Sequence, residues 1–586
     1  MLPFLLGSML LSCPAFAVSP SPVSIEETPE NSTHGQNASK EGIPLGDYLS
    51  GKFAESNGDS DKSIKFLHES LSRDPHNKDI MLNLYYALVS AGDIAEAASM
   101  AKKLPDAMAD DNNEFSPQFL LTLESAKRGQ YAEAEKHLRS IPKAGFNSVL
   151  VPLLQIWLKC ANGEIKIPVD TKDILPNGKM LMAHIYLHAG LIDELSGFKA
   201  NALQNYEAAA KETRLESMRA AEALANYYLR EGEKDKYIHF DNEYSAVHGE
   251  TVIDNENVPG QLPRPLVSNA TEGMAEAIYT VASIFHGVRT PADEITSLKM
   301  ALYLRPDFPA AHFLLASAYE INHAYPQAIA SYKLIPQESP YFLQSRIMTA
   351  YDRSETNEKA AALAELDKIA TEKPHMISAL LAKGDILRST NEYSSAIDAY
   401  NTAISRIKTP EKPHWIIFFS RGICYERIGN FEKTEADMRK ALMLSRDEPD
   451  VLNYLGYSWL TRRHNIAEAR KMIEEAYDAR PEDPQIIDSM GYALFAEGDF
   501  SSAQEYFERA LERIPDDPTI NEHLGDTYWQ LGRKTEAGYQ WQRALEDKPD
   551  EDNKKELLKK ISTGMPQIVP LKSAEAKKSA KSTAVQ

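Results

Sequence analysis

Cysteine is scarce in this sequence, whose 586 residues include only Cys13, Cys160 and Cys424. Small secreted proteins that rely on disulfides carry many more cysteines at close spacing. No two of the three have the Cys-x-x-Cys spacing that zinc sites and dithiol redox centres use. We therefore interpret Cys160 and Cys424 as small buried thiols.

Sequence patterns for nucleotide binding and nucleophilic catalysis are absent as well. The chain has neither the P-loop pattern nor the Gly-x-Gly-x-x-Gly of dinucleotide-binding folds, and it lacks the Gly-x-Ser-x-Gly of hydrolases. Basic residues are outnumbered, with 64 Lys and Arg against 85 Asp and Glu, which gives a formal net charge of −21. Because nucleic acids are bound through basic surfaces, we expect no nucleic-acid partner.

The sequence does contain a repeat of nearly constant length. Five glycines, Gly384, Gly422, Gly456, Gly491 and Gly525, follow one another at intervals of 38, 34, 35 and 34 residues. A helix that carries glycine can approach a partner helix closely if that partner presents alanine at the contact. In two copies, small and bulky residues follow the glycine at fixed offsets on one helical face: Ala503, Phe507 and Ala510, and then Ala537, Trp541 and Ala544.

This pattern resembles the tetratricopeptide repeat (TPR), a pair of helices with a 34-residue period, and the match is fullest at 449–551. Prolines that cannot continue a helix follow the second helix in several copies. These are Pro374, Pro515 and Pro549. Other copies are expected at 377–410, 343–376, 309–342 and 275–308, and weaker ones at 44–77, 78–111 and 115–148. Two further helix pairs, which are not good repeats, are expected at 183–216 and 218–251. The resemblance implies an all-α solenoid of helix-turn-helix units wound into a right-handed superhelix.

We divide the chain by composition and repeat quality. Residues 149–182 are expected to be irregular, since Pro152, Pro168 and Pro176 break any long helix. The other expected segments are a degenerate array at 44–251, a linker at 252–272, a second array at 273–551, a terminal helix at 552–565 and a disordered basic tail without an apolar face at 566–586. Whether the two arrays form separate lobes or one bent superhelix is left open.

The first 17 residues resemble a secretory signal peptide. A short apolar stretch ends at Ala15-Phe16-Ala17, a small-x-small cleavage pattern, and the segment is short for a bilayer span. We expect cleavage after Ala17 and a flexible N-terminus at 18–43. The alternative is a bacterial lipobox ending at Cys13, which would attach a lipid to that residue and bring the protein to a membrane surface.

One histidine pair could suggest a metal. His184 and His188 are four residues apart on an expected helix, but the glutamate of a His-Glu-x-x-His motif and a third ligand are missing. We interpret both as structural and expect no metal, no cofactor and no enzymatic activity.

In the TPR family, the groove that binds partners is lined by the first helix of each pair. Carried onto the best-matched copies, the resemblance implies a groove lined by acidic and aromatic residues, although aromatic residues at this spacing also serve as core. The TPR subset that clamps a terminal carboxylate needs Lys where this chain has Asp488 and Glu522, so that role is not expected. The candidate groove residues are Asn453, Tyr457, Asp488, Tyr492, Phe495, Glu522, Asp526 and Trp529.

These inferences together favour a non-enzymatic scaffold for protein–protein contact. The layout resembles exported TPR proteins of Gram-negative bacteria, which implies a periplasmic protein of the cell envelope, or an outer-membrane lipoprotein if Cys13 carries a lipid. We expect a basic or extended protein segment as the partner. The alternative is an accessory TPR subunit of an exopolysaccharide or glycosyltransferase system.

Overall fold

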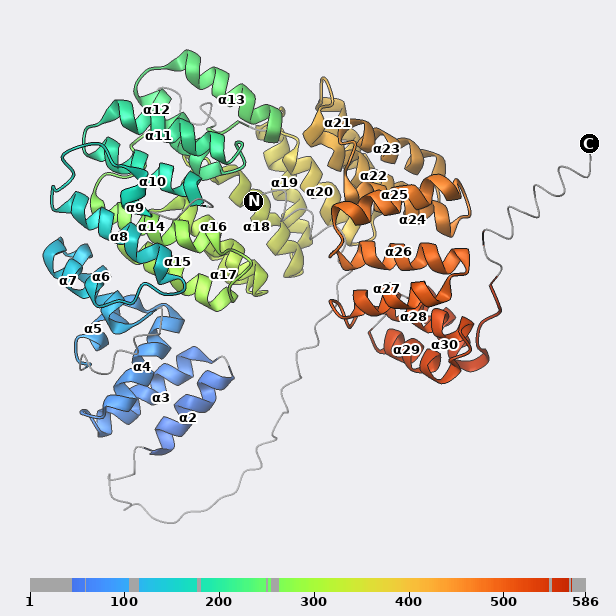
Figure 1. Ribbon diagram of the computed structural model, residues 1–586, viewed down its shortest axis with the longest axis horizontal. Coiled ribbons are helices and arrows are strands. Elements are labelled where there is room, and N and C mark those ends of the chain that lie inside the picture. Colours follow the sequence, from blue (N-terminus) through green and yellow to red (C-terminus); the bar gives the residue numbers. More distant parts are fainter. Residues whose placement is uncertain are drawn as a thin grey trace, which may run out of the picture. The chain divides into compact units, whose positions relative to one another are not determined.

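The computed structural model describes residues 45–57, 59–104, 115–175, 181–248, 251–253, 263–547, 551–568 and 571. Within these residues the regular structure is helical and no strand is present (Figure 1). The chain divides into two compact units between Ile386 and Leu387, here called the N-terminal unit and the C-terminal unit. The predicted all-α, helix-turn-helix solenoid is confirmed. The signal peptide 1–17, the N-terminus 18–43 and Cys13 lie outside the described residues.

The N-terminal unit consists of helix pairs packed in chain order. Its helices are α2 (Leu45–Ser56), α3 (Ser60–Arg73), α4 (Lys78–Ala91), α5 (Ile94–Ala101), α6 (Pro117–Lys127), α7 (Tyr131–Arg139), α8 (Asn147–Ala161), α9 (Thr171–Ile174), α10 (Met182–Leu195), α11 (Lys199–Glu212), α12 (Met218–Arg230), α13 (Lys234–His248), α14 (Ala270–Ile284), α15 (Pro291–Leu304), α16 (Pro309–Ile321), α17 (Tyr325–Tyr332), α18 (Phe342–Glu355) and α19 (Lys359–Glu372). Helix α20 (Ser378–Ser389) contains the division between the units.

The C-terminal unit continues the same pattern with greater regularity. Its helices are α21 (Tyr393–Arg406), the 3₁₀ turn η3 (Lys412–His414), α22 (Trp415–Arg427), α23 (Phe431–Leu444), α24 (Pro449–Thr461), α25 (Ile466–Ala479), α26 (Pro484–Glu497), α27 (Phe500–Leu511), α28 (Pro518–Gln530), α29 (Lys534–Glu546) and α30 (Glu551–Thr563). The inserted turn η3 accounts for the one long interval of the repeat, between Gly384 and Gly422.

Capping residues mark the start of the first helices in the best repeats. Asp483 and Asp517 each accept two backbone N–H groups at a helix start, and Pro484 and Pro518 take the first helical position. Proline is favoured there because its missing N–H has no partner within the helix. These residues fix where each repeat begins.

Helices within a pair approach at the repeat glycines. A Cβ at Gly491 would lie 2.8 Å from the Phe507 ring, and one at Gly525 would lie 2.6 Å from the Trp541 ring. Real Cβ atoms do not come so close, so each glycine permits its pair to pack. Phe507 and Trp541 are both buried, and they fill the space beside the contact.

Helix α8 corrects the prediction that Pro152 prevents a long helix. It runs 15 residues through that proline. Its buried side chains include Leu150, Val151, Leu154 and Trp157. Proline removes one backbone hydrogen bond, and the burial of this apolar face compensates for that loss.

The expected linker at 252–272 does not separate the two compact units. The helices that follow it, α14 and α15, pack back onto α8 and α10, and onto α4, α5 and α6. A Cβ at Gly273 of α14 would lie 2.2 Å from the Trp157 ring of α8. Arg219 of α12 and Glu276 of α14 form a buried ion pair with Nε and Oε1 2.8 Å apart. These long-range contacts join α14 and α15 to the N-terminal helices.

A buried carboxyl pair lies between α16 and α18. The carboxyls of Glu320 and Asp352 hydrogen-bond to each other, and Tyr332 donates to Glu320 at 2.9 Å. Burial raises the pKa of both groups, that of Glu320 to about 7, and the neighbouring Glu320 raises the pKa of Asp352 further. The pair therefore holds at least one proton at pH values where ordinary carboxyls are ionised.

Replacement of Gly491 by leucine should destabilise the C-terminal unit. The added side chain meets Phe507 and costs on the order of 1–3 kcal/mol or more. Gly538 is the matched control, because a Cβ there meets nothing within 4 Å on helix α29. Thermal melts should show a lower melting temperature for Gly491→Leu than for the wild type, and no decrease for Gly538→Leu. Equal melting temperatures of Gly491→Leu and the wild type would contradict this packing register.

The carboxyl pair predicts a pH-dependent stability of the N-terminal unit. The unfolded chain releases the shared proton above about pH 4, whereas the folded pair retains it towards pH 7 and beyond. Stability should therefore fall as the pH rises through this range. Glu320→Gln keeps a hydrogen-bonding group and removes the titration, so at pH 8 it should melt higher than the wild type. Glu338→Gln, at an exposed position, is the control. If the difference in melting temperature between Glu320→Gln and the wild type is the same at pH 5 and pH 8, the assignment is contradicted.

Candidate functional site

The predicted groove residues lie on α24, α26 and α28, the first helices of three consecutive pairs. Helix α24 packs on α26, and α26 packs on α28. We call the surface that these helices form with Tyr457, Tyr492, His523 and Trp529 the first-helix face. It gathers side chains from residues up to 72 positions apart, and the 34-residue period places them in register.

An aromatic cluster with one histidine occupies the middle of this face. The ring of Tyr492 lies 5.0 Å from that of Tyr457 and 5.0 Å from that of His523. The Tyr457 hydroxyl and His523 Nε2 are 3.4 Å apart. Both tyrosines are partly buried. Burial raises the pKa of both phenols, and nearby carboxylates raise it further, so they remain neutral hydroxyls.

Asp488 is buried and paired within the protein. It is 5% exposed, and its Oδ1 accepts from His523 Nδ1 at 2.9 Å. Burial opposes the charged imidazolium, but the Asp488 carboxylate, with Asp526 and Glu522 farther away, holds the pKa of His523 above its ordinary value. The charge of Asp488 is therefore balanced inside the fold.

Glu522 and Asp526 are also paired, here by the terminal helix α30. Lys560 Nζ lies 2.6 Å from a Glu522 oxygen and 2.7 Å from Asp526 Oδ2. Trp541 Nε1 donates to the other Asp526 oxygen at 2.8 Å. Burial raises the pKa of Asp526 despite Lys560. Each of the three carboxylates thus has a cationic partner inside the fold, with the single charge of Lys560 shared between Glu522 and Asp526. The expectation that these carboxylates attract a basic partner stays a prediction.

Trp529 contacts a later part of the chain. Its Nε1 donates to the Met565 carbonyl at 2.7 Å, and Gln530 Nε2 donates to the Pro566 carbonyl at 3.0 Å. The Ile568 N–H donates to Gln530 Oε1 at 3.3 Å. Residues 564–568 have no regular secondary structure. An irregular segment of this chain therefore lies against α28.

The expected disordered tail at 566–586 is ordered in part. Leu571 is 3% exposed and belongs to a buried cluster with Trp459, Leu460, Met490 and Ala493. The prediction judged the tail by its charged end and overlooked the apolar residues that begin it. The remaining tail residues, 569–570 and 572–586, lie outside the described part of the chain.

The last two predicted groove residues differ in their surroundings. Phe495 is 8% exposed, and its ring packs against Phe500 of the paired helix, so it is a core residue and not a lining residue. Asn453 is partly buried, and its Oδ1 has no hydrogen-bond partner among the described residues. Sequence reasoning missed His523 and Lys560. His523 lies 35 residues after Asp488, one repeat further on, and this spacing could have identified the pair.

The histidine pair of α10 has a structural role. Trp157 Nε1 donates to His188 Nδ1 at 3.1 Å, so the proton of the neutral imidazole lies on Nε2, 3.1 Å from Thr280 Oγ1. Burial lowers the pKa of both His184 and His188 to about 4. His188 thereby links α8, α10 and α14.

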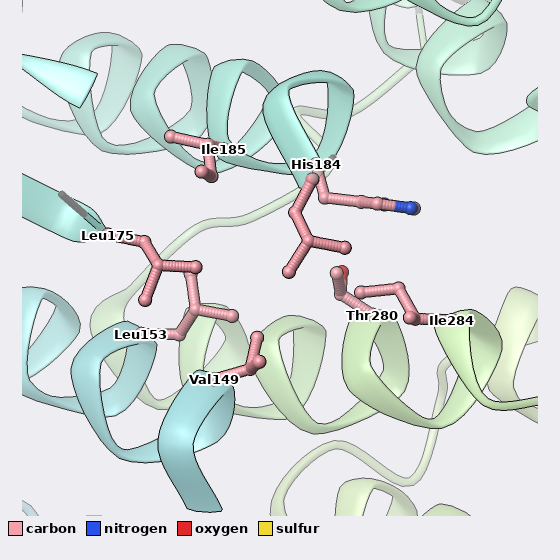
Figure 2. A pocket seen from close by; sticks show the side chains of 8 residues that line it. Val149, Leu153, Leu175, His184, Ile185, Thr280 and Ile284 are labelled. Atoms are coloured by element: carbon pink, nitrogen blue, oxygen red, sulfur yellow. The ribbon is translucent and has the colours of Figure 1, made fainter. Parts of the chain in front are cut away.

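His184 borders a small cavity lined otherwise by Thr280 and apolar side chains, among them Val149 and Leu153 (Figure 2). Its volume is about 10 Å³, near the least that admits one water molecule. Over the described residues, no group of three or more His, Cys, Asp or Glu side chains is placed to hold a metal ion. The same residues include no helix long and apolar enough to cross a membrane.

Tetratricopeptide repeat models match the chain at residues 54–116, 377–409 and 489–553. A TPR repeat-containing protein of Pseudomonas aeruginosa, PA4667, is 27% identical over 196 residues, which cover 33% of this chain and 32% of that protein. The chain thus spans about a third of this relative's length.

The structure comparison matches the APC/C hetero-tetramer Cut9-Hcn1 at 14% sequence identity and a TM-score of 0.37. This match covers 89% of this chain and 96% of that chain. Yeast Tom70 has 14% identity, 89% and 99% coverage and a TM-score of 0.28. The chain thus carries tetratricopeptide repeats in these three stretches, and its helix pairs have the helix-turn-helix form of that repeat.

Proposed function

We propose that this chain is a non-enzymatic scaffold that binds segments of other proteins on its first-helix face. Tetratricopeptide repeats suggest a role in protein–protein interaction, and proteins of this fold are generally non-catalytic. The observation that carries the proposal is the irregular segment 564–568, which Trp529 and Gln530 hold mainly through its backbone. A face that binds one irregular backbone has the groups needed to bind another.

The aromatic cluster supplies the rest of the proposed contact. Tyr457 and Tyr492 are partly buried rings with few rotatable bonds, so little conformational entropy is lost when a partner covers them. The carboxylates of Asp488 and Asp526 already have internal partners. We therefore propose recognition by apolar and main-chain contacts, in place of the basic partner expected from sequence.

Tyr492→Ala should weaken partner capture. Loss of a central aromatic contact costs roughly 1–3 kcal/mol in binding, about 5- to 150-fold in affinity. Tyr539→Ala removes the same side chain from an exposed position on α29 and serves as the control. Both variants and the wild type would be immobilised and compared for proteins captured from envelope extracts, after melting temperatures confirm folding. Identical partner sets and amounts for all three would contradict the proposed site.

We further propose that the protein is exported and acts in the bacterial cell envelope. The support is the apolar opening of the chain and the cleavage pattern at Ala15-Phe16-Ala17. N-terminal sequencing of protein purified from its native cells should begin at Val18. Recovery of cytosolic protein that retains Met1 would contradict export, whereas a lipid on Cys13 would favour the lipoprotein alternative.

A further inference from the structure

We infer that residues 564–568 and Leu571 act as a tethered competitor for the first-helix face, and that this face takes an uncharged, apolar segment of a partner protein. The inference rests on the proposed function of that face. It adds the chemical class of the partner and a means of regulation. Sequence positions 564–571 read Gly-Met-Pro-Gln-Ile-Val-Pro-Leu and contain no charged side chain.

The hydrogen bonds to the segment are bonds to its main chain. Gln530 donates to the Pro566 carbonyl at 3.0 Å and accepts from the Ile568 N–H at 3.3 Å, while Trp529 donates to the Met565 carbonyl at 2.7 Å. Main-chain groups are the same in every polypeptide apart from proline, which lacks the N–H. A segment of another protein can therefore make the same three bonds, but only after residues 564–568 leave.

Apolar side chains supply the selectivity. Met565 and Ile568 pack against the buried cluster that contains Leu524, Tyr528 and Trp541. Leu571 is buried in the next cluster along the array, against which Tyr492 also packs. The three side chains recur every three residues and reach two successive clusters. A charged side chain at any of these positions would lose its hydration without a partner, which favours a neutral apolar ligand.

Gly564 lets the segment approach α28. Its φ is +72°, a conformation that favours glycine, and a Cβ there would lie 2.1 Å from the Trp529 ring. Any other residue must therefore move the segment away from Trp529. A single substitution outside the helices can thus weaken the internal contact without altering the first-helix face.

Tethering gives the internal segment an advantage over a free one. A short connection produces an effective concentration on the order of 1 mM. If the free segment binds with a dissociation constant of about 0.1 mM, the tethered copy weakens an external competitor by about tenfold. A partner must exceed this competition or bind when the internal segment is displaced.

The test uses full-length protein and a fluorescein-labelled peptide with the sequence of residues 564–571. Binding is measured by fluorescence anisotropy to the wild type, Gly564→Ala and Gly532→Ala. Gly532 is the matched control, because its φ is +81° but a Cβ there meets nothing within 4 Å. Gly564→Ala should bind the peptide about tenfold more tightly than the wild type and the control. Gln530→Ala added to Gly564→Ala should remove this binding.

Ile568→Ser provides a second way to release the segment, and its effect decides the matter if Gly564→Ala lowers the melting temperature of the whole unit. Equal affinity of wild type and released variants would overturn the competition, while Tyr492-dependent capture of partners would still support the proposed function. Peptide binding that survives Gln530→Ala would overturn the assigned site. Wild-type dimers that dissociate in Gly564→Ala, seen by light scattering, would show that the segment binds a second copy and would overturn the intramolecular contact.

Discussion

The structure depends on one packing constraint, the close approach of two helices at a glycine on the first, which leaves room for a bulky side chain or the backbone of the second. At Gly456 an added Cβ would lie 2.8 Å from the Ala469 carbonyl oxygen, and at Gly190 it would lie 2.7 Å from the Tyr206 ring. Because each pair is so tightly joined, the first helices of successive pairs lie side by side. That arrangement brings Tyr457, Tyr492 and His523 together although one repeat separates each from the next.

The two units use the same constraint with different results. In the N-terminal unit, α14 and α15 return to pack on earlier helices, and buried polar contacts such as Arg219 with Glu276 fix that return. In the C-terminal unit, the terminal helix α30 packs on α29, and its Lys560 forms ion pairs with two carboxylates of α28. Residues 564–568, which follow α30, then lie against α28. Both units thus cover first helices with later parts of the chain.

The repeat period and the small residues predicted the helix pairs, because local spacing determines which side chains share a helical face. They could not predict the return of α14, since the contact between Gly273 and Trp157 joins residues 116 positions apart and leaves no periodic signal. The site was predicted by helix position alone. The rings of Tyr457 and Tyr492, which this method selected, lie 5.0 Å apart, but helix position could not show that Lys560 pairs with Asp526 or that Phe495 faces the core. The burial of Leu571 was missed because the tail was predicted to be disordered from its many lysines, and the apolar residues at its start were overlooked.

Hydrogen exchange at the backbone amide of Ile568 tests the central claim most directly, since this N–H donates to Gln530 within the proposed internal ligand. In the full-length protein the amide should exchange more slowly than in an unstructured chain. A saturating concentration of unlabelled peptide with the sequence of residues 564–571 should remove this protection. Exchange at the unstructured rate without peptide, or protection that peptide leaves unchanged, would contradict the account.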